Sequence, residues 1–143
     1  MLIKFLREIL FWKALSIIES KSVMDKIRKY TNERLLKLIS NKFTAKYTGK
    51  FARYKEAFEA GEDIIYREAP HMIVVSSVIN APCANVDPII ALSYIELYAQ
   101  SLGLGTCWCG FAQSCFKIFP KLSVVAQIPD GYKPVYCMLL GKS

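Results

Sequence analysis

The sequence is poor in the residues that metal, disulfide and nucleophilic chemistry require. Its 143 residues contain one histidine, His71, and five cysteines. A single histidine disfavours a Ser-His or Cys-His catalytic pair, so we assign no catalytic residue. The absence of a C-x-x-C pair disfavours a zinc or iron–sulfur site, although the spacing of Cys107, Cys109 and Cys115 keeps a metal site as a minor alternative to burial. In a chain without a convincing signal or membrane span, which we expect in the cytoplasm, an odd cysteine count argues against a disulfide framework.

Long uncharged apolar runs are also missing. The apolar N-terminus is interrupted by Lys4, Arg7, Glu8 and Lys13, and no small-residue cleavage site follows it. The next most apolar run, residues 69–86, contains a histidine, two prolines and two asparagines. We therefore expect neither a secretory signal nor an integral membrane segment.

Apolar residues are nevertheless abundant, at 53% of the chain. This length and composition suit one domain, residues 1–143, with a substantial core, and no internal repeat or linker divides it. The surplus of apolar side chains also suits a buried subunit interface.

Positive charge is concentrated in the first part of the chain. Residues 1–60 contain 14 Lys and Arg against 6 Asp and Glu, whereas residues 61–143 contain 5 against 6. Such a basic half is typical of nucleic-acid or anionic-membrane binding, but no nucleic-acid motif accompanies it. We favour solvated helix faces and no nucleic-acid partner, and keep an amphipathic helix over residues 1–12 as a remote membrane-surface alternative.

The stretch from Asp87 to Phe111 organises the chain. Asp87 is a suitable N-cap and Pro88 a suitable first helical residue, while Gly103 suits the left-handed position that ends a helix. Apolar residues point in nearly all directions around this helix, so we expect it to be buried on most sides. Residues 104–111 are predicted to be a loop.

The remaining elements indicate helices around a small sheet. The patterns predict strands over residues 14–18, 73–75 and 135–140, and helices over residues 22–39, 51–60 and 111–118, with Ser22 as the cap of the first. The fold class is therefore α+β, with a small central sheet flanked by helices in layers.

One ordered set of motifs resembles a known family. The segment L-x-A-x-S-L-G-L-G-T-C-W-C-G-F, followed by I-P-D-G-Y and a terminal apolar strand ending in Leu-Gly, resembles the FMN-dependent nitroreductases over roughly residues 64–141. This resemblance implies a layered nitroreductase-like fold and a homodimer that holds FMN at its interface. It also implies hydride transfer from NADH or NADPH through the flavin to a nitroaromatic, quinone or similar acceptor.

The resemblance also implies cofactor-binding residues. Trp108, Cys109 and Gly110 match the loop whose backbone N–H groups face the flavin N5 and O4 region. Glycine suits position 110 because a ring close to the backbone leaves no room for Cβ. Lys142 is a candidate contact for the phosphate. Without the resemblance, the glycines serve equally well to shape a tight turn.

The sequence departs from the family in its N-terminal part. The family's R-x-S-x-R motif, which grips the phosphate and ribityl chain, does not occur, and neither does the P-S-x-x-N-x-Q-P-W-like segment. Other arginines could replace them, although no spacing shows that they converge: Arg28, Arg34, Arg53 and Arg67. Two hypotheses therefore stand, namely a flavin oxidoreductase and a truncated, non-catalytic nitroreductase-like domain that does not bind flavin.

Overall fold

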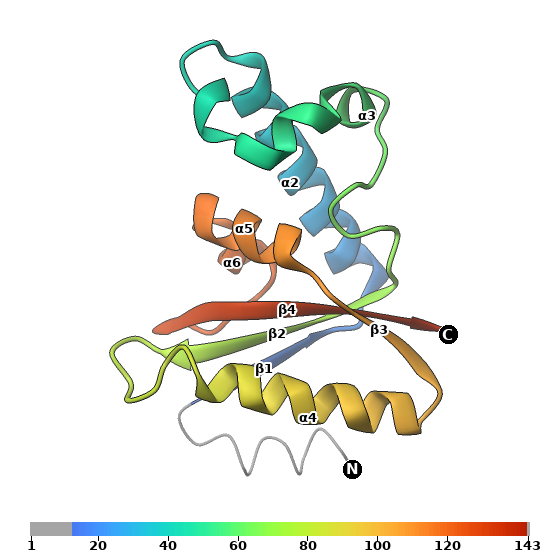
Figure 1. The fold of residues 1–143 in the computed structure, drawn as a ribbon, viewed down its shortest axis with the longest axis vertical. Helices are drawn as coiled ribbons and strands as arrows, with labels where there is room; N and C mark the ends of the chain where they lie inside the picture. Colours follow the sequence, from blue (N-terminus) through green and yellow to red (C-terminus); the bar gives the residue numbers. More distant parts are fainter. Residues whose placement is uncertain (1–12, 143) are drawn as a thin grey trace.

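The computed structural model describes residues 13–142, in which four strands form one antiparallel sheet with the order β1-β2-β4-β3 (Figure 1). The strands are β1 (Lys13–Ile18), β2 (His71–Val78), β3 (Leu104–Trp108) and β4 (Tyr132–Lys142). β2 and β4 are the interior strands, and β1 and β3 form the two edges. The helix expected over residues 1–12 lies outside the described residues.

Helices cover both faces of the sheet. Helix α4 (Asp87–Ser101) lies on one face, and α2 (Lys21–Ser40), α5 (Gly110–Ile118) and α6 (Leu122–Val125) lie on the other (Figure 1). Between α2 and β2 the chain forms two 3₁₀ helices (Ala45–Tyr47 and Gly49–Tyr54) and the short helix α3 (Lys55–Glu59). This confirms the α+β class and the layered arrangement of helices around a small sheet that the sequence predicts.

Strand alternation divides the core into two parts. On β2, Met72 and Val74 pack in the larger cluster with α2, α5 and α6, while Ile73 and Val75 pack in the smaller cluster with α4. A strand that is apolar at consecutive positions is therefore buried on both faces. The prediction of a central strand over residues 73–75 is confirmed.

Several helix boundaries differ by one or two residues from those expected. Ser20, not Ser22, caps α2, because its hydroxyl accepts a hydrogen bond from the Val23 N–H at 3.4 Å. The N-cap of α4 is Val86, so Asp87 rather than Pro88 is the first helical residue. Gly103 has φ of +74° directly after the C-cap, as predicted. The predicted helix over residues 51–60 is instead a 3₁₀ helix followed by α3.

Two larger expectations are wrong. Residues 104–108 are not a loop but the edge strand β3, because their backbone pairs with β4 over five positions. Helix α4 is not buried on most sides, since within this chain its buried residues are Pro88, Leu92, Ile95 and Ala99. The opposite face of α4 exposes a stripe of large apolar side chains: Ile90, Tyr94, Leu97, Tyr98 and Leu102.

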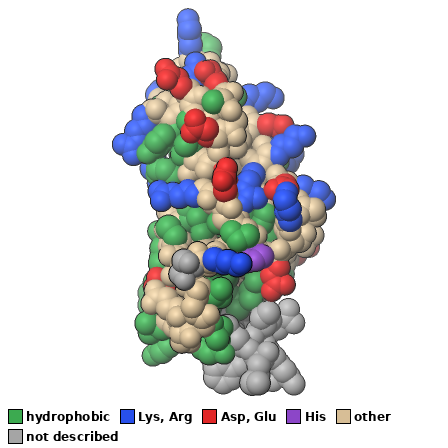
Figure 2. All heavy atoms as spheres, turned by 90° about the vertical axis from the view of Figure 1, so that its right-hand side faces the viewer, with side chains coloured by type: hydrophobic (Ala, Val, Ile, Leu, Met, Phe, Trp, Pro, Cys, Tyr) green, Lys and Arg blue, Asp and Glu red, His purple; other side chains and the backbone are tan. Residues whose placement is uncertain are grey.

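Charged side chains are concentrated at one end of the molecule, although the exposed apolar side chains of Phe43 and Tyr47 also belong to the segment between α2 and α3. Figure 2 shows most of the visible lysine and arginine side chains over the part built from α2 to α3, and apolar side chains nearer the sheet. Among the described residues, no helix is long and apolar enough to cross a membrane.

Candidate functional site

A buried carboxylate shapes the loop that precedes β2. Asp63 accepts hydrogen bonds from Arg28 Nε at 2.8 Å and from the backbone N–H groups of Tyr66 and Glu68 at 2.9 Å each. Arg28 also donates through Nη2 to the Ala69 carbonyl. The Asp63 side chain is 8% exposed and that of Arg28 is 18% exposed, so this ion pair is shielded from water.

The same loop adopts an unusual backbone conformation. Arg67 and Glu68 have φ of +49° and +56°, in the left-handed region that non-glycine residues rarely occupy. Such a conformation persists where surrounding contacts determine it. Here the Asp63 side chain binds the amide of Glu68, and the Tyr66 hydroxyl lies 2.8 Å from Thr31 Oγ1 on α2. The loop therefore holds Arg67 in a defined place.

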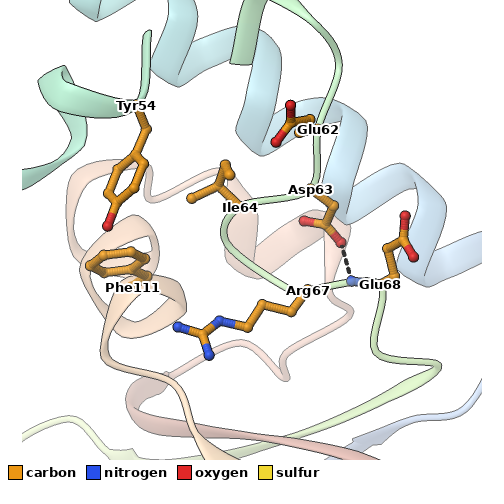
Figure 3. A pocket seen from close by; sticks show the side chains of 7 residues that line it. All are labelled: Tyr54, Glu62, Asp63, Ile64, Arg67, Glu68 and Phe111. Atoms are coloured by element: carbon orange, nitrogen blue, oxygen red, sulfur yellow. Dashed lines mark hydrogen bonds between the residues drawn. The ribbon is translucent and has the colours of Figure 1, made fainter. Parts of the chain in front are cut away.

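Arg67 lines a pocket between the loop and α5. This pocket has a volume of about 440 Å³, and Tyr54, Ile64 and Phe111 form its apolar side. Figure 3 shows the Arg67 side chain extending toward Phe111, away from Glu62 and Glu68. The pocket thus combines two aromatic rings with one cation, and the carboxylates of Glu62, Asp63 and Glu68 also line it.

A second pocket, of about 400 Å³, lies along β3 and shares Arg67 and Glu68 with the first. Its other lining residues come from the loop and the two paired strands: Ala69, Pro70, Gly105, Thr106, Cys107, Leu139, Leu140, Gly141 and Lys142. Arg67 and Lys142 therefore line the same pocket, although 75 positions separate them in the sequence.

The outer edge of β3 also offers backbone groups. Cys109 N–H donates to the Cys137 carbonyl at 2.9 Å, which makes this a hydrogen-bonded pair. Because hydrogen-bonded positions alternate in antiparallel pairs, the N–H and C=O groups of Thr106 and Trp108 point away from β4. Within residues 13–142 β3 is an edge strand, so no described strand pairs with these groups, although the Cys107 thiol donates to the Trp108 carbonyl at 3.7 Å.

The Trp108 side chain lies on the α4 side of the sheet. Its Nε1 donates to Glu96 Oε2 at 2.8 Å, and its ring lies 5.4 Å from the Tyr136 ring, between centroids. Thr106 Oγ1 donates to the other Glu96 oxygen at 3.2 Å. The indole therefore ties β3 to α4, and the Trp108 backbone is the part directed to the open edge.

The Cys109 side chain is buried and makes its hydrogen bonds within the chain. Its thiol, in a residue that is 7% exposed, donates to the Ile65 carbonyl at 3.2 Å and accepts from the Ala112 N–H as the cap of α5. Gly110 begins that helix, so its N–H has no acceptor within the helix. A Cβ at Gly110 would lie 3.3 Å from the Tyr136 hydroxyl, so a larger residue there would require Tyr136 to shift by a few tenths of an ångström.

The three buried thiols are poor candidates for metal ligands. Burial raises the pKa of Cys109, raises that of Cys115 to about 12 and raises that of Cys137 well above its usual value. Metal coordination needs thiolates, which these sites disfavour. Among residues 13–142 no group of three or more His, Cys, Asp or Glu side chains is arranged to hold a metal ion.

The four residues that the resemblance indicated thus lie at the two ends of β3. Trp108, Cys109 and Gly110 lie at its C-terminal end, and Lys142 pairs with Leu104 at the other end. Leu104 and Trp108 are four positions apart along the strand, or about 13 Å. The structure adds Arg67 to this set. Arg67 is placed by contacts between residues far apart in the sequence, Asp63 and Arg28. The local sequence therefore gives no signal for Arg67 except that it is an arginine.

The fold is shared with solved structures of flavin-binding proteins. A nitroreductase with bound FMN from Desulfitobacterium hafniense matches with a TM-score of 0.66 and 22% identity, covering 92% of this chain and 66% of its own. A nitroreductase with bound FMN from Bacteroides fragilis matches with a TM-score of 0.66 and 21% identity, and the match covers 92% of this chain and 65% of the Bacteroides chain. Oxidized iodotyrosine deiodinase bound to FMN and 3-iodo-L-tyrosine matches with a TM-score of 0.60 and 18% identity, and the match covers 92% of this chain and 66% of the deiodinase chain.

The profile of the nitroreductase family matches residues 12–142, and the chain belongs to this family. The match extends well beyond the residues 64–141 that carried the resemblance. A comparison with curated protein sequences gives no significant match. The chain spans about two thirds of the length of the FMN-bound structures above.

We expect Asp63→Ala to destabilise the fold by about 3 kcal/mol, because Arg28 keeps only the exposed Asp25 as a carboxylate partner and two loop amides lose their acceptor. Urea denaturation followed by circular dichroism measures this loss. As a control, Glu59→Ala removes the exposed Lys55–Glu59 pair and should cost less than about 1 kcal/mol. Equal stability of the two variants would show that the Asp63 carboxylate does not organise the loop.

We expect two of the five cysteines to react with an aromatic disulfide reagent in the native protein. Cys83 and Cys107 are exposed, whereas Cys109, Cys115 and Cys137 are buried thiols of raised pKa. All five should react in denaturant, and mass spectrometry identifies the native-state sites. Rapid native modification of Cys109 would contradict its place in the core.

Proposed function

We propose that this chain is one subunit of a homodimeric, FMN-dependent NAD(P)H oxidoreductase that reduces nitroaromatic or quinone-type acceptors in the cytoplasm. One observation carries the proposal. Arg67 and Lys142 line a single pocket beside the open edge of β3, in a fold shared with FMN-bound nitroreductases.

In the proposal, the described residues hold one side of a bound FMN, in a pocket that Glu68 also lines. The phosphate carries about two negative charges and needs cations or amides in advance, and Lys142 with Arg67 supplies two cations on one pocket. The ring system needs donors and acceptors along one edge. In the proposal these are the outward backbone groups of Thr106 and Trp108 and the free first N–H of α5 at Gly110.

Each residue then has a distinct task. The chemistry that FMN would supply at this site is hydride transfer from the nicotinamide to the acceptor, and the residues of this chain would bind and orient it. Lys142, which pairs with the first residue of β3, and Arg67, in the loop beside that strand, would hold the anionic end of the cofactor. Trp108 and Gly110 orient the ring through their backbones. Cys109 positions that backbone, because its N–H and thiol both bond within the chain.

A second copy of the chain would cover the opposite side of the cofactor. The exposed stripe of α4 carries Tyr94 at 70% and Leu97 at 66% exposure, with further apolar residues one turn away on either side. Exposed apolar stripes of this kind mark protein interfaces. In the proposed dimer, this apolar stripe of α4 is buried between the two subunits.

FMN titration of the purified protein tests the cofactor site. We expect saturable quenching of flavin fluorescence, and about tenfold weaker binding for Arg67→Gln and for Lys142→Gln, because each removes one charge-assisted contact. Both side chains are exposed, so these variants should fold. Lys46→Gln, whose ammonium lies over the Tyr47 ring, is the matched control and should bind as the wild type does.

Absence of FMN binding by the folded wild-type chain would refute the oxidoreductase proposal. It would favour the alternative of a nitroreductase-like domain that does not bind flavin. Wild-type affinity in both variants would instead refute the assignment of Arg67 and Lys142 to the phosphate.

Size-exclusion chromatography with light scattering tests the dimer. We expect the wild type to elute at twice the subunit mass, and Leu97→Glu to elute as a monomer, because it places a charge in the apolar interface. Val124→Glu, on a side chain that is 75% exposed on α6, should leave the dimer intact. A monomeric wild type, or a dimeric Leu97→Glu variant, would contradict the proposed interface.

A further inference from the structure

A third pocket lies on the same side of the sheet, between the C-terminal half of α2 and the link from α5 to α6. It has a volume of about 550 Å³, within the range of roughly 300–1,000 Å³ that is usual for small organic ligands. None of its lining residues belongs to β3, to β4 or to the loop that carries Arg67. It is therefore separate from the proposed cofactor site.

The walls of this pocket are largely apolar. They comprise Tyr30, Leu38, Ile118, Phe119 and Pro120. The rings of Tyr30 and Phe119 meet edge to face, with centroids 6.4 Å apart, and Phe119 is 9% exposed. This aromatic contact gives the pocket a floor that is already packed before any ligand enters.

The charged residues of the pocket are all cationic. Arg34, Lys37 and Lys121 line it, and no Asp or Glu does. The Arg34 guanidinium lies over the Tyr30 ring, 5.2 Å from its centroid. Among the described residues, no ion pair joins any of these three cations to a carboxylate. All three are exposed, while Tyr30 and Leu38 are half-buried, so the positive charge lies at the mouth and the apolar surface beneath it.

We propose that this pocket binds a small amphipathic carboxylate, with its apolar body against Tyr30, Leu38 and Phe119 and its anionic group between Arg34, Lys37 and Lys121. Charge complementarity selects an anion, because an acidic neighbour that would neutralise these cations is missing from the lining. The apolar floor selects a ligand with a hydrocarbon or aromatic body over a simple inorganic anion. The site is independent of FMN and of the dimer.

Isothermal titration calorimetry of the wild-type chain with decanoate tests this assignment. We expect saturable binding that weakens as salt is added, because the charges are exposed. Decyltrimethylammonium, with the same chain length and the opposite charge, should not bind, and butyrate, with the same carboxylate and a short chain, should bind at least tenfold more weakly. Equal binding of either control compound would overturn the proposal.

Variants locate the site. The double change Arg34→Gln and Lys37→Gln should weaken decanoate at least tenfold, and Ile118→Glu should do the same by placing a negative charge at the wall. Ile118 is 39% exposed, so this change is compatible with folding. The double change Lys42→Gln and Lys46→Gln, at exposed positions outside the pocket, should leave binding unchanged. Decanoate affinity that is the same in the pocket variants as in the wild type would overturn the assignment, whatever the outcome with FMN.

Discussion

The ion pair between Arg28 and Asp63 is the interaction on which the two pockets that share Arg67 depend. One carboxylate accepts from a guanidinium and from two loop amides, so it links the first turns of α2 to the entrance of β2. A buried pair contributes little net stability when compared with apolar residues, but removing one partner is costly. Its effect here is conformational: the loop is held in a left-handed turn, and Arg67 is directed to the β3 edge.

The sheet separates two chemical environments. On the face covered by α2, the side chains of β4 such as Cys137 and Leu139 close the larger core, and the two pockets that share Arg67 lie near this face. On the other face, α4 packs on Ile73 and Val75 through Leu92 and Ile95, and its outer stripe remains exposed. The proposed cofactor site and the proposed dimer interface thus meet at β3, whose Trp108 side chain hydrogen bonds to Glu96 of α4.

Local patterns predicted the interior of this fold better than its edges. The apolar runs of β2 and β4 and the glycine that ends α4 are local features, and the structure confirms them. β3 was missed because glycine and polar residues interrupt it, and its pairing with β4 is a long-range contact that no local pattern contains. Arg67 was one of four available arginines. Only tertiary contacts decide that Arg28 is bound to Asp63 while Arg67 reaches the pocket with Lys142.

The uneven distribution of charge along the chain can be interpreted from the positions of the three pockets. The excess of cations in residues 1–60 lies mostly on the segments around α2 and α3, above the face of the sheet where the pockets open. FMN, nicotinamide nucleotides and organic carboxylates are all anions, and a field of one sign raises the local concentration of such ligands and their association rates. Few of these basic residues need to touch a ligand for this effect, which falls with ionic strength. Solvated helix faces and anion binding are therefore compatible interpretations of the same charges, and the Arg34, Lys37 and Lys121 pocket is the place where the charges also meet an apolar floor.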